Sequence, residues 1–122
     1  MKTFGTSIHC MDGRIKESVL YYLKENYQLD YVDTITEPGP EKIMAECGDE
    51  LQSIQDRVDI SVYKHKSGII AVSAHHDCSG NPSSKKDKLQ QVEKSAVFIQ
   101  KNYPDVRIVK LWIDENWEVS EL

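Results

Sequence analysis

The chain has 122 residues and a formal net charge of −5, from 15 Lys and Arg against 20 Asp and Glu. This length fits a single domain over 1–122, and the acidic balance argues against nucleic acid or an anionic membrane as the main partner. No segment approaches the roughly 20 apolar residues of a membrane-spanning helix, and the first residues lack the apolar core of a signal peptide. We therefore expect a cytoplasmic protein whose three cysteines are thiols or metal ligands and not a disulfide framework.

Segments typical of strands alternate with segments typical of helices along the chain. Strands are expected over 2–9, 31–36, 68–74 and 106–113, with a short edge strand over 117–119. Helices are expected over 15–26, 41–64 and 85–103, the second of them divided near Gly48. This alternation predicts an α/β fold, in which a mostly parallel central sheet of four to five strands is flanked by helices.

Two stretches rich in polar residues each follow an apolar, strand-like segment. The first is His9-Cys10-Met11-Asp12-Gly13-Arg14, and the second is His75-His76-Asp77-Cys78. The carboxyl ends of parallel strands meet at one edge of a sheet, so these stretches could be neighbours. Cys10, His75 and Cys78 would then offer two sulfurs and one nitrogen, a ligand set that zinc accepts in catalytic sites with one open position. We predict one Zn²⁺ at these three residues.

Asp12 and Arg14 lie two and four residues after the first of these ligands. Arg14 can hold the Asp12 carboxylate by a bidentate pair, and Asp12 can accept a hydrogen bond from a water on the metal. Zinc and two thiolates sum to zero charge, so such a centre needs outside help to hold a hydroxide that attacks an electrophilic carbon. We predict that Asp12 and Arg14 are catalytic residues, with Arg14 positioning Asp12.

The pattern Cys10-x-Asp12-x-Arg14 followed by His75-x-x-Cys78 resembles the β-class carbonic anhydrase family, as a short, divergent member. The resemblance implies a doubly wound sheet, a zinc site at Cys10, His75 and Cys78, and an Asp12–Arg14 dyad. It also implies reversible hydration of carbon dioxide to bicarbonate by a zinc-bound hydroxide, in a homodimer or higher even oligomer.

The chain departs from the family pattern at two places. Thr36-Glu37-Pro38-Gly39 stands where the family has Arg-Asn-Ala-Gly, and Cys78 is followed by Ser79, with Gly80 one place later. Two alternatives therefore stay open. The substrate could be another small carbon electrophile, such as carbonyl sulfide or carbon disulfide, or the chain could be a non-catalytic zinc-binding relative in which Asp12 closes the fourth position.

Other residues that could carry chemistry receive plainer interpretations. A phosphatase loop of the form His-Cys-x₅-Arg is excluded because Lys16 stands at the arginine position. Glu37 could be a solvated loop carboxylate or line the pocket, and His76 could handle protons or merely be exposed. We expect a structural role for His9, a packed thiol at Cys47 and a surface position for His65. We also expect a solvated helix face, and not an anion site, at Lys85, Lys86 and Lys88, and core or interface positions for Trp112 and Trp117.

Overall fold

The computed structural model describes residues 2–122 and contains one sheet with the strand order β2-β1-β3-β4-β5. The strands are β1 (Phe4–Cys10), β2 (Tyr31–Glu37), β3 (Ile69–His75), β4 (Arg107–Ile113) and β5 (Val119–Glu121). The helices are α1 (Lys16–Tyr27), α2 (Pro40–Glu46), α3 (Leu51–Asp59), the π-helical turn η1 (Ile60–Lys64) and α4 (Lys85–Asn102). Strands β1 to β4 are parallel, and β5 pairs antiparallel with β4. The predicted fold class is confirmed.

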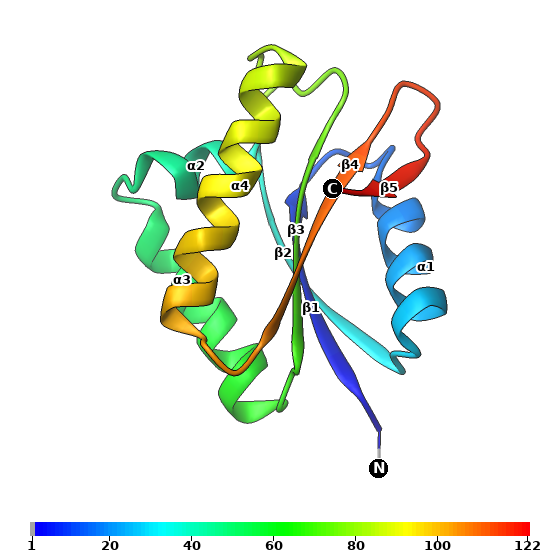
Figure 1. Ribbon diagram of the computed structural model, residues 1–122, viewed down its shortest axis with the longest axis vertical. Helices are drawn as coiled ribbons and strands as arrows, with labels where there is room; N and C mark the ends of the chain where they lie inside the picture. The colour runs from blue at the N-terminus through cyan, green and yellow to red at the C-terminus, as the bar shows by residue number, and fades with distance from the viewer. Residues whose placement is uncertain (1) are drawn as a thin grey trace.

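Helices cover both faces of the sheet, as Figure 1 shows: α1 lies on one side and α2, α3 and α4 on the other. Every residue of β3 is buried, which explains why its sequence is mainly apolar, with Ser73 and His75 as the polar members. The helical spacing of Ile15, Val19, Tyr22 and Leu23 predicts that they share one face; Ile15, Val19 and Leu23 are buried, and Tyr22 is partly buried. They pack with Val109, Leu111 and Ile113 of β4 on that side of the sheet.

The strand order reverses between β1 and β3. From β1 the chain moves outward to β2, then returns past β1 to form β3 on its other side. The parallel register pairs Ile8 with Val72, so Cys10, which ends β1, lies close to the carboxyl end of β3. In sheets of this kind, ligands bind at the carboxyl ends of the strands where the order reverses. The two polar stretches of the sequence meet at this place.

The helical segment predicted over 41–64 is divided near Gly48, as expected. Helix α2 begins at Pro40 in its first turn and ends before Cys47, whose backbone is left-handed (φ 52°). The expectation of a packed thiol at Cys47 is wrong, because this residue caps the helix in an exposed turn. Its thiol does not contribute to the core.

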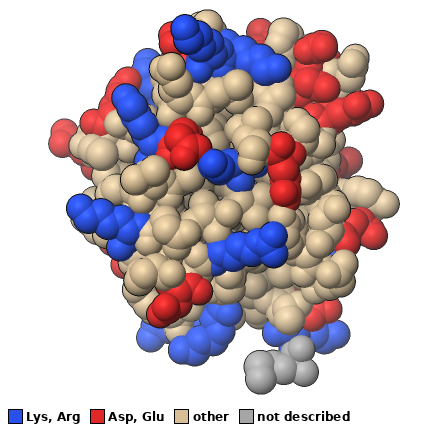
Figure 2. Space-filling view, in the orientation of Figure 1, with Lys and Arg blue, Asp and Glu red and all other residues tan. Residues whose placement is uncertain are grey.

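The surface of the molecule carries charged residues of both signs. Over residues 2–122, no helix has the length and hydropathy needed to cross a membrane. Figure 2 shows acidic and basic side chains interspersed across one face of the molecule. Large apolar side chains that are at least half exposed are spread along the chain, with Ile60 and Tyr63 both on η1; they include Met11, Tyr21, Ile60, Tyr63, Val97 and Leu122. Exposed singly, such residues need no special explanation.

Candidate metal centre

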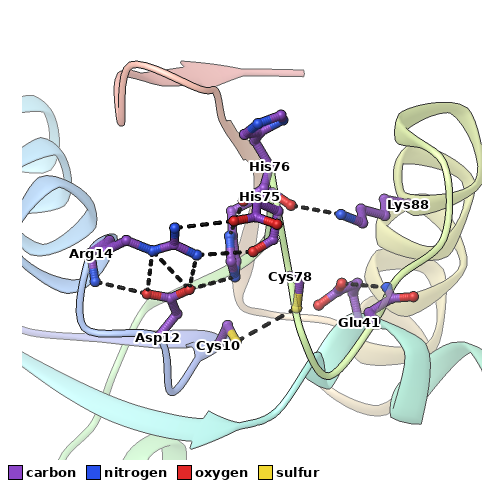
Figure 3. A network of polar contacts seen from close by, with 10 residues as sticks. Cys10, Asp12, Arg14, Glu41, His75, His76, Cys78 and Lys88 are labelled. Atoms are coloured by element: carbon purple, nitrogen blue, oxygen red, sulfur yellow. Dashed lines mark hydrogen bonds and ion pairs between the residues drawn. The ribbon is translucent and has the colours of Figure 1, made fainter.

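The structure brings Cys10, His75 and Cys78 together at the point where the strand order reverses (Figure 3). Cys10 is the last residue of β1, His75 is the last residue of β3, and Cys78 follows three residues later. Their potential ligand atoms all lie within 4.8 Å of one another. The residues are only 5%, 1% and 4% exposed, respectively. The sequence-predicted ligand set is therefore one buried cluster.

The donor atoms of this cluster fit a zinc ion. Two sulfurs bound tetrahedrally to zinc at about 2.3 Å each stand about 3.8 Å apart, and the Sγ atoms of Cys10 and Cys78 are 3.7 Å apart. His75 Nδ1 lies 2.7 Å from the backbone oxygen of His76, a carbonyl that can only accept, so Nδ1 carries the proton. The other nitrogen, Nε2, is buried and has no hydrogen-bond partner within residues 2–122. A buried, unpaired ring nitrogen beside two thiols is a donor set ready for a metal.

The electrostatics of the two thiols also suit a cation. Burial acts to raise the pKa of the Cys10 thiol, but the adjacent His75 imidazole and the backbone of Gly39 and Asp12 lower it to about 7. Burial and the neighbouring Cys10 charge raise the pKa of Cys78 to about 11. Two thiolates at this separation repel each other. A dication between them would remove that repulsion and deprotonate both thiols.

Backbone conformation explains how His75 and Cys78 reach the same point. Asp77 adopts a left-handed conformation (φ 58°), which turns the chain sharply between the two ligands. The amide of His76 donates to the backbone oxygen of Ile113 (2.9 Å), which ties the start of the turn to β4. The amide of Asn81 donates to the backbone oxygen of Cys78 (3.2 Å). The turn is therefore held at both ends.

Asp12 and Arg14 form the bidentate pair expected from the sequence. Arg14 Nε lies 3.0 Å from Asp12 Oδ1, and Arg14 Nη2 lies 2.7 Å from Asp12 Oδ2. Hydrogen bonds from the Arg14 side chain lower the pKa of the Asp12 carboxyl to about 2. Asp12 Oδ2 is also 4.0 Å from His75 Nε2, the free nitrogen of the cluster. An ionised acceptor thus stands beside the metal-binding atoms.

Arg14 has two further contacts that the sequence pattern did not indicate. Its Nη1 lies 3.2 Å from Asp77 Oδ2, and its Nη2 donates to the Asp77 backbone oxygen at 3.0 Å. Its guanidinium also lies 4.5 Å from the centre of the Trp117 ring, a cation–π contact. Arg14 therefore links the two polar stretches and the turn before β5. This role depends on contacts distant in sequence, so spacing alone could not reveal it.

The loop of Pro38 and Gly39 packs closely against the loop of Gly80 and Asn81. A methyl group at Gly80 would lie 2.5 Å from the Pro38 carbonyl carbon, and one at Gly39 would lie 2.8 Å from Asn81 Cβ. Gly39 has a left-handed backbone (φ 65°), so it needs glycine for its conformation as well as its space. The loop after β2 and the loop after Cys78 are therefore shaped to each other.

Lys88 is buried, and the expectation that it lies on a solvated helix face is wrong. It is 4% exposed, and its Nζ donates to the His75 backbone oxygen at 3.0 Å. A signal was available, because Lys88 stands four residues before Val92 and so falls on the buried stripe of α4. Lys85 and Lys86 are exposed, as expected.

Glu41 is a second buried charged residue that the sequence did not single out. It is fully buried at the start of α2, and its Oε2 accepts a hydrogen bond from Asn81 Nδ2 at 2.6 Å. Its other oxygen, Oε1, has no hydrogen-bond partner within residues 2–122. Burial raises the pKa of this carboxyl. No motif or periodicity distinguishes Glu41 from the exposed acids near it.

The remaining candidate residues lie outside the cluster. His9 is fully buried 2.7 Å from Ser7 Oγ, and burial lowers its pKa to about 4. Glu37 forms an ion pair with Arg57, so it is neither a free loop carboxylate nor a member of the cluster. His76 is exposed and lines a cavity beside Cys78. His65 is exposed, Trp112 is buried, and Trp117 is partly buried.

Comparisons with known proteins identify the fold and the family. In solved structures, the fold is similar to a carbonic anhydrase from Glaciozyma antarctica (TM-score 0.64, 15% identity, covering 95% of this chain and 80% of that one). It is also similar to tetrameric β-carbonic anhydrases from Sordaria macrospora (TM-score 0.62, 10% identity, covering 100% of this chain and 82% of that one). The comparison with curated protein sequences finds no match. A family model described as "Putative carbonic anhydrase" matches residues 1–122, and the chain belongs to this family.

Proposed function

We propose that this protein is a zinc-dependent lyase that reversibly hydrates carbon dioxide to bicarbonate, with zinc held by Cys10, His75 and Cys78. The observation that carries the proposal is the buried three-donor cluster, whose sulfurs are 3.7 Å apart and whose free nitrogen lies 4.0 Å from an ionised carboxylate. Membership of the carbonic anhydrase family gives the reaction class. When bound, zinc would acidify a water molecule so that it can attack carbon near neutral pH.

The chain's own groups would orient the reactants. The Nδ1–H of His75 donates to the His76 carbonyl, which fixes the ring with Nε2 free to bind the metal. Arg14 holds both oxygens of Asp12, so this carboxylate can accept a hydrogen bond only with its remaining lone pairs. We infer that Asp12 Oδ2 accepts a hydrogen bond from the O–H group of the attacking water or hydroxide. This hydrogen bond would orient that nucleophile toward the substrate.

A second candidate rests on the position of Asp12. Because Asp12 Oδ2 is 4.0 Å from His75 Nε2, a small movement would allow it to become the fourth ligand. The chain would then be a non-catalytic zinc-binding protein. A third candidate, hydrolysis of carbonyl sulfide or carbon disulfide, rests on the loop Glu37-Pro38-Gly39-Pro40, where the family stretch is replaced.

We also propose that the protein forms a homodimer or a higher even oligomer. Within residues 2–122, β2 pairs only with β1, so its outer edge is open to a second copy. The Sordaria macrospora enzymes to which the fold is similar are tetrameric. Light scattering coupled to gel filtration would test this proposal, and a monomer at micromolar concentration would contradict it.

Stopped-flow hydration of carbon dioxide tests the proposed function. We expect zinc-loaded wild type and Cys47→Ser to be active, because Cys47 is exposed and outside the cluster. Asp12→Asn should retain zinc but lose roughly 100-fold or more in rate. A wild type that holds one zinc and does not hydrate carbon dioxide would refute the anhydrase assignment, and assays with carbonyl sulfide would then separate the two remaining candidates.

A further inference from the structure

A cavity of about 450 Å³ lies next to the metal cluster, between the end of β3 and the start of α4. Cys78 forms part of its wall. The other lining residues come from the loop around Cys78, the start of α4, β4 and the turn after β4; they include His76, Ser83, Lys85, Lys88, Trp112 and Glu115. Figure 2 shows basic side chains gathered at the end of the molecule where α4 begins. The chain as a whole carries a net charge of −5, so this concentration of positive charge is local.

The ammonium group of Lys88 is the distinctive feature of this cavity. An ammonium has three N–H donors, and the His75 backbone oxygen is the acceptor of Lys88 Nζ within residues 2–122. Over the same residues, no carboxylate oxygen lies within the 4.0 Å of an ion pair with Lys88. A charge that is almost fully buried without a counter-ion is costly unless something else neutralises it.

Neighbouring acids form no ion pair with Lys88 within residues 2–122. The Glu41 carboxyl group lies on the same side of the cluster (Figure 3), close enough for the Lys88 charge to act on its pKa, but its Oε2 accepts a hydrogen bond from Asn81 and neither oxygen is within 4.0 Å of Lys88 Nζ. Asp77, which also lines the cavity, directs its Oδ2 to Arg14 at 3.2 Å. Glu115 is exposed on the turn before β5. Two donors of a buried ammonium therefore remain available beside an open cavity.

Other groups around the cavity would assist a bound anion. Lys85 Nζ lies 5.1 Å from the centre of the Trp112 ring, which places a second ammonium over the cavity wall. Helix α4 has 18 residues and begins here with its Ser84 side chain accepting from the Asp87 amide, so the positive end of a long helix dipole faces the same region.

We propose that this cavity binds a small carboxylate-type anion, a class that includes bicarbonate, through the buried Lys88 ammonium. The site goes beyond the hydration reaction proposed above and does not depend on it. Because Lys88 donates to the backbone of His75, and because Cys78 forms part of the wall, an anion bound here would contact the loop that carries two of the proposed metal ligands.

Nuclear magnetic resonance of the two tryptophan indole groups tests the proposal on the intact, zinc-loaded protein. Trp112 lines the cavity, whereas Trp117 lies over Arg14, near the catalytic dyad. We expect sodium bicarbonate and sodium acetate to shift the Trp112 indole signal saturably, with sodium chloride as the control at equal ionic strength. A saturable Trp112 shift with both anions identifies a general carboxylate site. A shift with bicarbonate alone links the site to the proposed reaction.

Substitutions make the test specific. Lys88→Met should weaken anion binding roughly 30-fold or more, because it removes a buried charge. The matched control, Lys86→Met, removes an exposed charge two residues earlier on α4 and should leave binding within about two-fold. Lys85→Met should weaken binding about two- to five-fold, and Glu115→Gln should strengthen it by a similar factor. Lys85→Met and Glu115→Gln change exposed residues, so they test the proposal even if Lys88→Met does not fold.

Three results would overturn the proposal. One is the absence of any saturable Trp112 shift, which would mean that water alone satisfies Lys88. Another is a shift confined to Trp117, which would place the anion at the proposed metal instead. The third is equal anion affinity in the wild type, Lys85→Met and Lys88→Met. None of these outcomes bears on carbon dioxide hydration, so failure of this proposal is distinguishable from failure of the proposed function.

Discussion

Substitution of Gly80 by alanine tests whether the loop after Cys78 is shaped to the loop after β2. The added methyl would lie 2.5 Å from the Pro38 carbonyl carbon, 2.6 Å from its Cβ and 2.8 Å from its Cα. These are backbone and ring atoms, which cannot yield by rotating a side chain. Overpacking of this kind costs about 1–3 kcal/mol. Taking a middle value, we expect a loss of about 2 kcal/mol, or about 8 °C in melting temperature for a domain of this size.

Gly48→Ala is the matched control for this experiment. No atom lies within 4 Å of a methyl group at Gly48, so the same chemical change there should leave stability unchanged or raise it by about 0.4–1 kcal/mol. Urea unfolding and competitive zinc titration would compare the two variants. We expect Gly80→Ala to lose both stability and zinc affinity, since the clash displaces the loop that carries Cys78. Equal unfolding midpoints for the two variants would refute the proposed fit between the loops.

Two further predictions concern the core and the buried carboxyl group. Leu111→Ala, at a fully buried position of β4, should cost about 2–5 kcal/mol in urea unfolding, and a cost below about 1 kcal/mol would contradict the packing of α1 on the sheet. Burial raises the folded-state pKa of Glu41 above its ordinary 4.5, so the folded protein keeps a proton that the unfolded chain releases. Stability should therefore fall as the pH rises from about 4.5 to the raised pKa. In Glu41→Gln, measured across the same pH range, this decline should be absent, and an unchanged slope would show that Glu41 does not cause it.

The local pattern of the sequence predicts most of the fold. The mainly apolar run before His75 identifies a central parallel strand, and the helical spacing of Ile15, Val19, Tyr22 and Leu23 identifies the helix face that packs on the sheet. Element boundaries differ from the predictions by one to two residues because helix and strand ends depend on caps and pairing partners. The π-helical end of the segment over 41–64 has no sequence signal of comparable strength.

The site is predictable only in part, for a physical reason. Residues at the ends of strands can be placed by topology, so the sequence alone groups Cys10, His75 and Cys78. The contacts that surround them depend on packing between segments distant in sequence. The hydrogen bond from Asn81 to Glu41 and that from Lys88 to the His75 carbonyl are of this kind. The sequence does not indicate them because they depend on how α2 and α4 pack on the sheet.

Zinc content, measured by elemental analysis after exhaustive dialysis, tests the central claim most directly. We predict one zinc per chain in the wild type and in Cys47→Ser, the variant at the exposed cysteine. Cys10→Ser and Cys78→Ser should retain little zinc, because each removes one of the three proposed protein ligands. A metal-free wild type, or full retention of zinc by both cluster variants, would contradict a metal centre at Cys10, His75 and Cys78.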